Sequence, residues 1–279
     1  MYPKYLDPTT DFGFKKLFGE EESKPFLKNF LFDLLELPFP IVELTFLPTE
    51  QRSRTPEERL GIFDVYCQDE KGRRFIVEMQ KAEQFHFKDR ALYYSTFPIV
   101  QQAQRGDWDY QLNAVYCIGI LNFIFEDDDD RYIRHVGLTD LQTHKTFSDK
   151  LKFVYVELPK FNLTLDQLSR GRDKWIYFLK HTAELREVPA VFSEVPFQLA
   201  FHQAELAQLT EEESYYYEGS LKRARDGYAS LETARIEGQR EKAFEIARPL
   251  IKQQQMPLET VLQVTGLTGE DLQLLSPTS

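Results

Sequence analysis

The chain has 279 residues, of which 42% are hydrophobic, and a formal net charge of −11 at pH 7. This length can bury a substantial core, either as one large domain or as a core with an appendage. The negative charge argues against a surface that holds nucleic acid by charge alone, because phosphate binding depends on Lys and Arg displacing counterions. Any contact with DNA would have to be local.

The cysteines and the hydropathy of the chain bear on its location. Cys67 and Cys117 both lie in strand-like runs and are typical of small core residues, not of a disulfide framework or a zinc site. The N-terminus carries no signal pattern, and no apolar run approaches the length that spans a bilayer. We therefore expect a cytoplasmic protein with no membrane partner.

The first predicted element is a helix that begins in the segment TDFGFKKLFG, residues 10–19. Phe14, Leu17 and Phe18 recur there at helical spacing, and Asp11 stands at or just inside the start, where Asp is a natural N-cap. A second amphipathic helix is predicted over residues 21–35. Alternation over residues 41–46 predicts the first strand.

Residues 61–90 predict a β-hairpin followed by the start of a helix. The tripeptide of residues 70–72, which ends in Gly72, fits a three-residue loop with its glycine in the left-handed region. Counting outward from this loop places Asp64 opposite Glu78, with Gln80 on the same face. The other expected pairs are Cys67 with Phe75, Tyr66 with Ile76, Val65 with Val77, Phe63 with Met79, and Ile62 with Gln80.

This register gives the two faces of the hairpin different characters. One face is expected to be wholly apolar and to include Phe63, whereas the other carries the acids beside Ile62, Tyr66 and Ile76. Two carboxylates directly opposite one another repel, and a divalent cation is the simplest compensation. The alternative is a solvated sheet face that happens to carry acids. The pattern alone leaves both interpretations open.

The next predicted elements are a helix and three strands. Residues 87–104 predict a helix with Arg90, Tyr94, Phe97 and Gln101 on one stripe. Such a stripe more often packs in a core than stacks on bases, but a guanidinium near a metal site can neutralise a phosphate. Residues 114–123 predict a buried central strand, and residues 132–138 and 151–158 predict two more. The acidic run at residues 126–130 predicts a solvated loop tip.

From residue 166 onward the pattern is helical. A charged helix is expected after residue 218, followed by two or three short helices in residues 244–275, the last capped by Thr268 with Asp271. This tail resembles a helix-turn-helix, and a small helical hairpin for packing or dimerisation gives the same pattern. Because Arg248 and Lys252 are the only cations in residues 244–275, we favour an interaction role and predict a homo-oligomer formed through the C-terminal helices.

The motifs of this sequence, in their order along the chain, resemble those of the PD-(D/E)xK nuclease superfamily. Within it they are most similar to the Rpn group of recombination-promoting nucleases and putative transposases. The resemblance rests on residues 10–19, the D-(x)13-E-x-Q hairpin, the RALYYS helix, and VELPKF at residues 156–161. It covers roughly the first 165 residues. Gln80 stands where most members of the superfamily carry Lys, although this group typically has Gln.

The resemblance implies a fold and a function. The fold would be α/β, with a mixed central sheet flanked by helices in residues 1–165 and a helical C-terminal region in residues 166–279. The function would be Mg²⁺-dependent hydrolysis of phosphodiesters in DNA, with Mn²⁺ or Ca²⁺ as other possible ions, in recombination, transposition or defence. A catalytically silent protein that assembles or tethers DNA is the alternative. The implied metal ligands are Asp64, Glu78 and the carbonyl of Met79, and the implied catalytic set adds Gln80, Asp11 and Arg90.

Overall fold

The structure is a computed structural model that describes residues 3–51, 61–82, 86–103, 108–125, 129–252 and 256–271. The chain forms two compact units, residues 1–220 and residues 221–279. The first unit contains a mixed sheet flanked by helices, and the second is helical. The expected α/β class with a helical C-terminal region is therefore confirmed, while the domain boundary expected after residue 165 stays a prediction.

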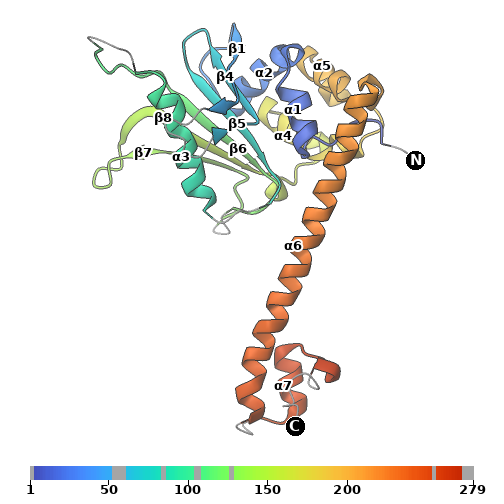
Figure 1. Ribbon diagram of the computed structural model, residues 1–279. Coiled ribbons are helices and arrows are strands. Elements are labelled where there is room, and N and C mark those ends of the chain that lie inside the picture. Colours follow the sequence, from blue (N-terminus) through green and yellow to red (C-terminus); the bar gives the residue numbers. More distant parts are fainter. Residues whose placement is uncertain are drawn as a thin grey trace. The chain divides into compact units, whose positions relative to one another are not determined.

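A six-stranded sheet forms the centre of the first unit, in the order β1-β4-β5-β6-β8-β7 (Figure 1). Strands β5, β6 and β8 are parallel neighbours, and the other pairs are antiparallel. Because parallel strands end at the same edge of a sheet, Gln80, Leu121 and Glu157 lie side by side. The strands of this sheet are β1 (Leu44–Phe46), β4 (Val65–Asp69), β5 (Arg74–Gln80), β6 (Val115–Leu121), β7 (Ile133–Thr139) and β8 (Thr146–Glu157).

The hairpin of β4 and β5 has the predicted register from its loop out to Val65. Val65 pairs with Val77, and the next two pairs along the strands also match the prediction. Gly72 has a φ of 75°, as the three-residue loop requires. Asp69 accepts hydrogen bonds from the backbone N–H groups of Lys71 and Arg73, at 3.0 and 2.8 Å, which fixes the loop.

The register prediction is wrong before Asp64. Ile62 lies in β3 (Gly61–Ile62) and pairs with Glu50 of β2 (Glu50–Gln51), not with Gln80. The backbone N–H of Phe63 donates to the carbonyl of Thr49 at 3.1 Å. Its ring packs in the cluster on the acid-bearing face, 5.3 Å from the ring of Tyr66, so the expected apolar face does not include Phe63. Long-range contacts thus override the simple alternation here.

Helix α3 (Phe87–Val100) packs on one face of the sheet (Figure 1). The stripe that begins at Arg90 faces the sheet: Tyr94 and Phe97 lie 5.4 and 6.3 Å from Phe63, and Gln101 accepts a hydrogen bond from the hydroxyl of Tyr66 at 2.9 Å. These aromatic residues are therefore core residues, as their helical spacing favoured.

A second group of helices packs together around the fully buried Trp175. The indole ring lies 4.4 Å from the ring of Phe197, and its N–H donates to the side chain of Asn29 at 3.0 Å. The helices of this group are α1 (Asp11–Phe18), α2 (Lys24–Leu34), α4 (Gly171–His181) and α5 (Val195–Ala204). Short 3₁₀ turns lie at Glu21–Ser23, Leu158–Lys160, Leu165–Gln167, Thr182–Glu184, Ala190–Phe192 and Leu206–Gln208.

Helix α6 (Glu211–Lys252) begins in the first unit, where its first ten residues hold α1 and the segment before it. These contacts satisfy backbone N–H groups at the start of the chain and pair a lysine of α1 with an acid of α6. They are Asp7 N–H to the hydroxyl of Tyr217 (2.7 Å), Phe12 N–H to the hydroxyl of Ser220 (3.3 Å), and Lys16 Nζ to Glu213 Oε1 (2.6 Å).

The second unit contains the rest of α6 and helix α7 (Leu258–Thr265), which enclose a small core at Ala247, Val261 and Leu267. Thr268 and Asp271 make the reciprocal hydrogen bonds of a capping box, as predicted. Among the residues that the structure describes, no helix has both the length and the apolar character needed to cross a bilayer.

Candidate active site

The two acids of the hairpin face each other, as the register predicted. Asp64 directly precedes β4, and its Oδ2 accepts a hydrogen bond from the backbone N–H of Met79 at 2.9 Å. Glu78 lies on β5, and its Oε1 accepts from the backbone N–H of Asp64 at 3.3 Å. Each carboxylate is therefore held by the backbone of the opposite strand, which fixes both side chains at the end of the hairpin.

Burial and mutual repulsion shift the titration of this pair. Burial raises the pKa of Glu78 to about 8, and the negative charge of Asp64 adds to the shift. Burial also raises the pKa of Asp64, against the lowering effect of the hydrogen bond from Met79. The metal-free site therefore favours a protonated Glu78 near neutral pH.

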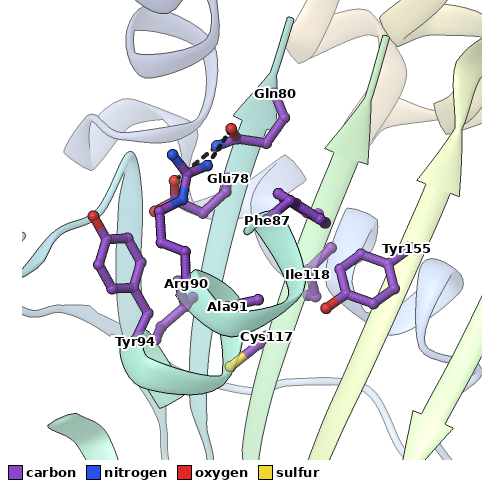
Figure 2. A pocket seen from close by; sticks show the side chains of 11 residues that line it. Glu78, Gln80, Phe87, Arg90, Ala91, Tyr94, Cys117, Ile118 and Tyr155 are labelled. Carbon is purple, nitrogen blue, oxygen red and sulfur yellow. Dashed lines mark hydrogen bonds between the residues drawn. The ribbon is translucent and has the colours of Figure 1, made fainter. Parts of the chain in front are cut away.

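Gln80 connects the acid pair to helix α3. Its Nε2 donates to Glu78 Oε2 at 3.2 Å, and its Oε1 accepts a hydrogen bond from the guanidinium of Arg90 (Figure 2). The guanidinium also lies 5.9 Å from the centre of the Tyr94 ring. The structure thus brings together four residues predicted from the sequence: Asp64, Glu78, Gln80 and Arg90.

Asp11 approaches the acid pair through Lys15. The N-cap of α1 is Thr10, whose hydroxyl accepts from the backbone N–H of Gly13 at 3.1 Å, so the cap interpretation of Asp11 is wrong and Asp11 is the first residue inside the helix. Lys15 Nζ lies 2.7 Å from Asp11 Oδ1 and 3.5 Å from Asp64 Oδ1. Sequence reasoning missed Lys15, although its spacing of four residues from Asp11 indicates an ion pair on one helix face.

An apolar hollow lies beside the carboxylate of Glu78, between α3 and strands β5, β6 and β8 (Figure 2). Gly119 occupies its floor, because Gly119 pairs with Glu78 on one side and with Tyr155 on the other. A Cβ atom at Gly119 would come within 2.9 Å of the Tyr155 ring. The missing side chain therefore keeps the space beside Glu78 open. Cys117 also lines the hollow and, like Cys67, carries a free and buried thiol.

The donor atoms of the acid pair fit a divalent cation. The described residues contain no group of three or more His, Cys, Asp or Glu side chains that could hold a metal ion. Mg²⁺, however, is commonly held by one or two carboxylates and keeps several waters. Asp64 and Glu78 supply two adjacent carboxylates, and burial is the main cause of their raised pKa values. A hard dication beside them would favour their charged forms and offset the cost of burying them.

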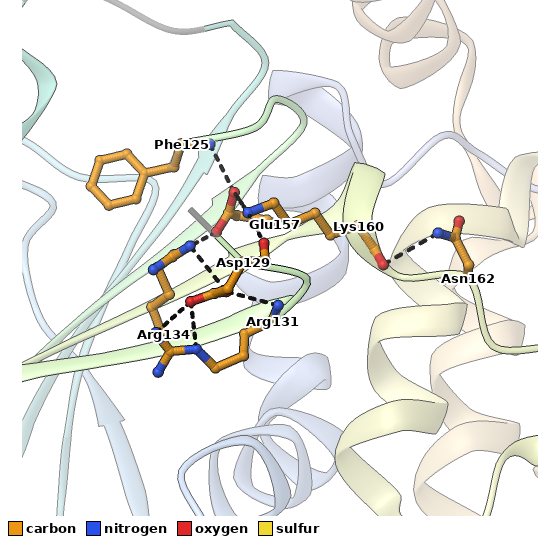
Figure 3. Close-up of polar contacts among 7 residues, drawn as sticks. All are labelled: Phe125, Asp129, Arg131, Arg134, Glu157, Lys160 and Asn162. Atoms are coloured by element: carbon orange, nitrogen blue, oxygen red, sulfur yellow. Dashed lines mark hydrogen bonds and ion pairs between the residues drawn. The ribbon is translucent and has the colours of Figure 1, made fainter. Parts of the chain in front are cut away.

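A second cluster of charges lies at the end of β8 and in the segment that follows β6 (Figure 3). Glu157 is fully buried at the end of β8 and accepts from Arg134 Nε and from the backbone N–H of Phe125, both at 2.8 Å. Phe125 in turn packs 4.9 Å from the ring of Tyr155. The charges of this cluster are paired, so its role is to fix the segment that follows β6.

The acidic run predicted as a solvated tip has a different role at its described end. Residues 126–128 lie outside the described residues. Asp129 accepts hydrogen bonds from Arg131 Nε at 2.8 Å and from Arg134 at 3.2 Å. The carboxylate of Asp129 is therefore paired with Arg131 of the same loop and with Arg134 of β7, and these arginines lower its pKa to about 2.

The chain was compared with protein families, with curated proteins and with solved structures. A family model described as "PD-(D/E)XK nuclease family transposase" matches residues 8–234. The matched range includes α1, the hairpin, α3 and the whole sheet. No curated protein matches the chain, and no solved structure does.

Proposed function

Because this chain belongs to the PD-(D/E)XK nuclease family of transposases, we propose that it is a metal-dependent endonuclease that hydrolyses phosphodiester bonds in DNA. The observation that carries the proposal is the pair Asp64 and Glu78, two largely buried acids held face to face by the backbone of the hairpin. Two carboxylates held this close in a largely buried place repel each other, and without a cation this repulsion lowers the stability of the folded protein. The pair also lies at the strand ends beside an open hollow. Mg²⁺ is the proposed ion, and Mn²⁺ or Ca²⁺ could occupy the same site.

Each site residue has a proposed part in the reaction. Asp64 and Glu78 would hold the ion together with the carbonyl of Met79. When bound, a divalent ion activates water and offsets charge on the phosphate. The guanidinium of Arg90 can donate to a phosphate oxygen as negative charge develops there. Gln80 holds Arg90 and can orient the attacking water through its amide.

The biological setting follows from the family. We propose a role in transposition or recombination, or in defence against mobile elements, with DNA as the partner. The two buried free cysteines suit a reducing, cytoplasmic compartment. We also propose that residues 1–165 form the nuclease core. The helices of residues 166–279 would form a separate region through which the protein self-associates.

The test is nicking of supercoiled plasmid by the purified protein with Mg²⁺, Mn²⁺ or a chelator. Asp64→Ala and Glu78→Ala should each abolish cleavage and keep the circular dichroism spectrum of the wild type. Asp149→Ala is the matched control, because this acid of β8 is exposed and lies outside the site. A plasmid cut equally by all four proteins would identify a contaminating nuclease and contradict the proposal.

The alternative function is that of a silent member of the family that acts as an assembly or DNA-tethering module. A glutamine at position 80 in place of lysine is compatible with this alternative, and the intact pair of Asp64 and Glu78 argues against it. A wild type that leaves plasmid intact with every ion, yet retards DNA or forms a stable oligomer, would support this alternative.

A further inference from the structure

The PD-(D/E)XK motif ends in a lysine, and this chain has Gln80 at that position of strand β5. We infer that Lys15 of α1 supplies the missing positive charge, and that the ammonium group of Lys15 contacts the scissile phosphate of DNA. This inference rests on the proposed nuclease function and adds a catalytic residue to it. The charge would then come from helix α1 and not from strand β5, which carries Gln80.

The position of the ammonium group supports this role. Lys15 Nζ lies 3.5 Å from Oδ1 of Asp64, whereas Oδ2 of the same carboxylate is occupied by the N–H of Met79. The Lys15 side chain is 42% exposed and that of Asp64 is 16% exposed. The ammonium therefore lies where the buried pair meets solvent, which is where a DNA backbone would arrive.

Gln80 cannot supply this charge itself. Its amide is neutral, and both ends are engaged, with Glu78 on one side and Arg90 on the other. Arg90 comes from α3 and Lys15 from α1, so two cations flank the acid pair from two different helices. A phosphate placed at the pair would have a donor on each side.

A formal charge count shows what Lys15 changes. Asp11, Asp64 and Glu78 contribute three negative charges when ionised, and Lys15 and Arg90 contribute two positive charges, which leaves −1. A divalent ion brings the site to +1, and one phosphodiester then neutralises it. Without Lys15 the loaded site would be neutral before the phosphate arrives. In a protein with a net charge of −11, that difference decides whether the site attracts DNA.

Lys150 of β8 provides a matched control. Its side chain is 46% exposed, and its ammonium lies 3.9 Å from the exposed carboxylate of Asp149, outside the site. A substitution at Lys150 removes the same charge from the protein but leaves the contact between Lys15 and Asp64. Any effect specific to Lys15 therefore reports its position at the site and not the net charge of the protein.

The experiment is single-turnover cleavage of a DNA substrate at saturating Mg²⁺. Lys15→Ala should be about 10²-fold slower than the wild type, the usual scale for losing one group that stabilises transition-state charge. Lys15→Arg should keep most of the rate, and Lys150→Ala should match the wild type.

Two binding measurements distinguish a catalytic role of Lys15 from a structural role. With Ca²⁺ and DNA, the plot of log affinity against log salt should be less steep for Lys15→Ala by about 0.9, the contribution of one phosphate contact. Without DNA, calorimetry should show that Lys15→Ala binds Mg²⁺ at least as tightly as the wild type, because the ammonium no longer competes for Asp64.

Three results would overturn the inference. If Lys15→Ala cleaves at the wild-type rate while the wild type is active, Lys15 has no catalytic part and the nuclease function stands. If Lys15→Ala loses ion binding in step with cleavage, its role is structural. If the wild type cleaves nothing with any ion, the proposed function fails and this inference fails with it.

Discussion

Gln80 has both ends of its side chain bound within the site, to Glu78 and to Arg90. Gln80→Ala would release Glu78 and Arg90 together and leave the two carboxylates in place. We expect single-turnover cleavage to slow by about 10²-fold, the scale of one positioning interaction. Calorimetry should show a smaller loss of Mg²⁺ affinity than in Glu78→Ala. A Gln80→Ala variant as fast as the wild type would reduce Gln80 to an ordinary strand residue.

The pKa of Glu78 makes the stability of the metal-free protein depend on pH. An acid with a raised pKa keeps its proton in the folded state after the unfolded chain has lost it. Between the ordinary value of 4.5 and about 8, the free energy of unfolding should therefore fall as pH rises. Urea denaturation in chelator at pH 5.5 and pH 8 measures this fall. Glu78→Gln should flatten it, and an equal pH dependence in both proteins would argue against the shift.

The proton on Glu78 also makes the affinity for a divalent ion depend on pH. A carboxylate must lose its proton before it binds a cation, so Mg²⁺ affinity should rise from pH 6 to pH 8. Calorimetry in buffers of different ionisation enthalpy should detect a proton released on binding at pH 7. Ion affinity that is independent of pH, with no proton released, would place the cation away from Glu78.

Prediction from sequence succeeded at residues whose partners are close along the chain. Asp64 and Glu78 could be placed face to face because a strand has a period of two and the loop at Gly72 sets the register. Lys15, Gly119 and Tyr155 could not be assigned, since separate elements bring them to the hairpin. Their positions depend on how α1, β6 and β8 pack, which local patterns do not encode.

At the scale of elements, the hairpin shows where a local pattern stops being sufficient. Alternation places Phe63 on the face opposite to the acids, but a backbone hydrogen bond to Thr49 and a cluster of aromatic rings place it with Tyr66. Both influences come from residues outside the hairpin, so the pattern of β4 alone could not reveal them. The change of direction occurs immediately before Asp64 and helps to fix where that carboxylate lies.

A substitution that adds a single methyl group at Gly72 tests whether the hairpin loop needs a glycine there. Gly72 has a positive φ, and a Cβ atom there would also come within 2.6 Å of the Asn113 side chain. We expect Gly72→Ala to lower the free energy of unfolding by about 1 kcal/mol or more, while cleavage persists in the folded fraction. Gly137→Ala is the control, because the structure shows open space around Gly137. Equal stability of the two variants in urea titrations would contradict this account of the loop.

At the scale of the whole molecule, the class of fold could be predicted but the strand order could not. The run that became β6 is continuously apolar, as expected of a central strand with covered faces. Nothing in the sequence indicated that β8 would lie between β6 and β7, because that arrangement depends on a long parallel pairing. The charged run after residue 210 became one continuous helix, α6, which the composition allowed but did not require.

The division of the chain at residue 220 suggests a truncation. A chain that ends at Asp226 keeps every residue of the first unit, including the start of α6 that holds α1. We expect it to cleave plasmid as the full chain does and to lose self-association, because the exposed part of α6 and the small helical unit are absent. Light scattering and the nicking assay measure the two properties. An unchanged mass in solution would remove the C-terminal helices as the oligomer interface.

The contacts of α1 also set the order in which the site is completed during synthesis. Leu6 donates its backbone N–H to the carbonyl of Ala204 at 2.9 Å, and the start of α6 supplies Tyr217 and Ser220 to the same region. Translation releases the N-terminus first, so the hairpin acids emerge long before these partners exist. The contacts that hold α1, which carries Asp11 and Lys15, are therefore complete only after residue 220 has left the ribosome. A copy of the chain that ends before residue 204 keeps the hairpin acids but lacks these contacts.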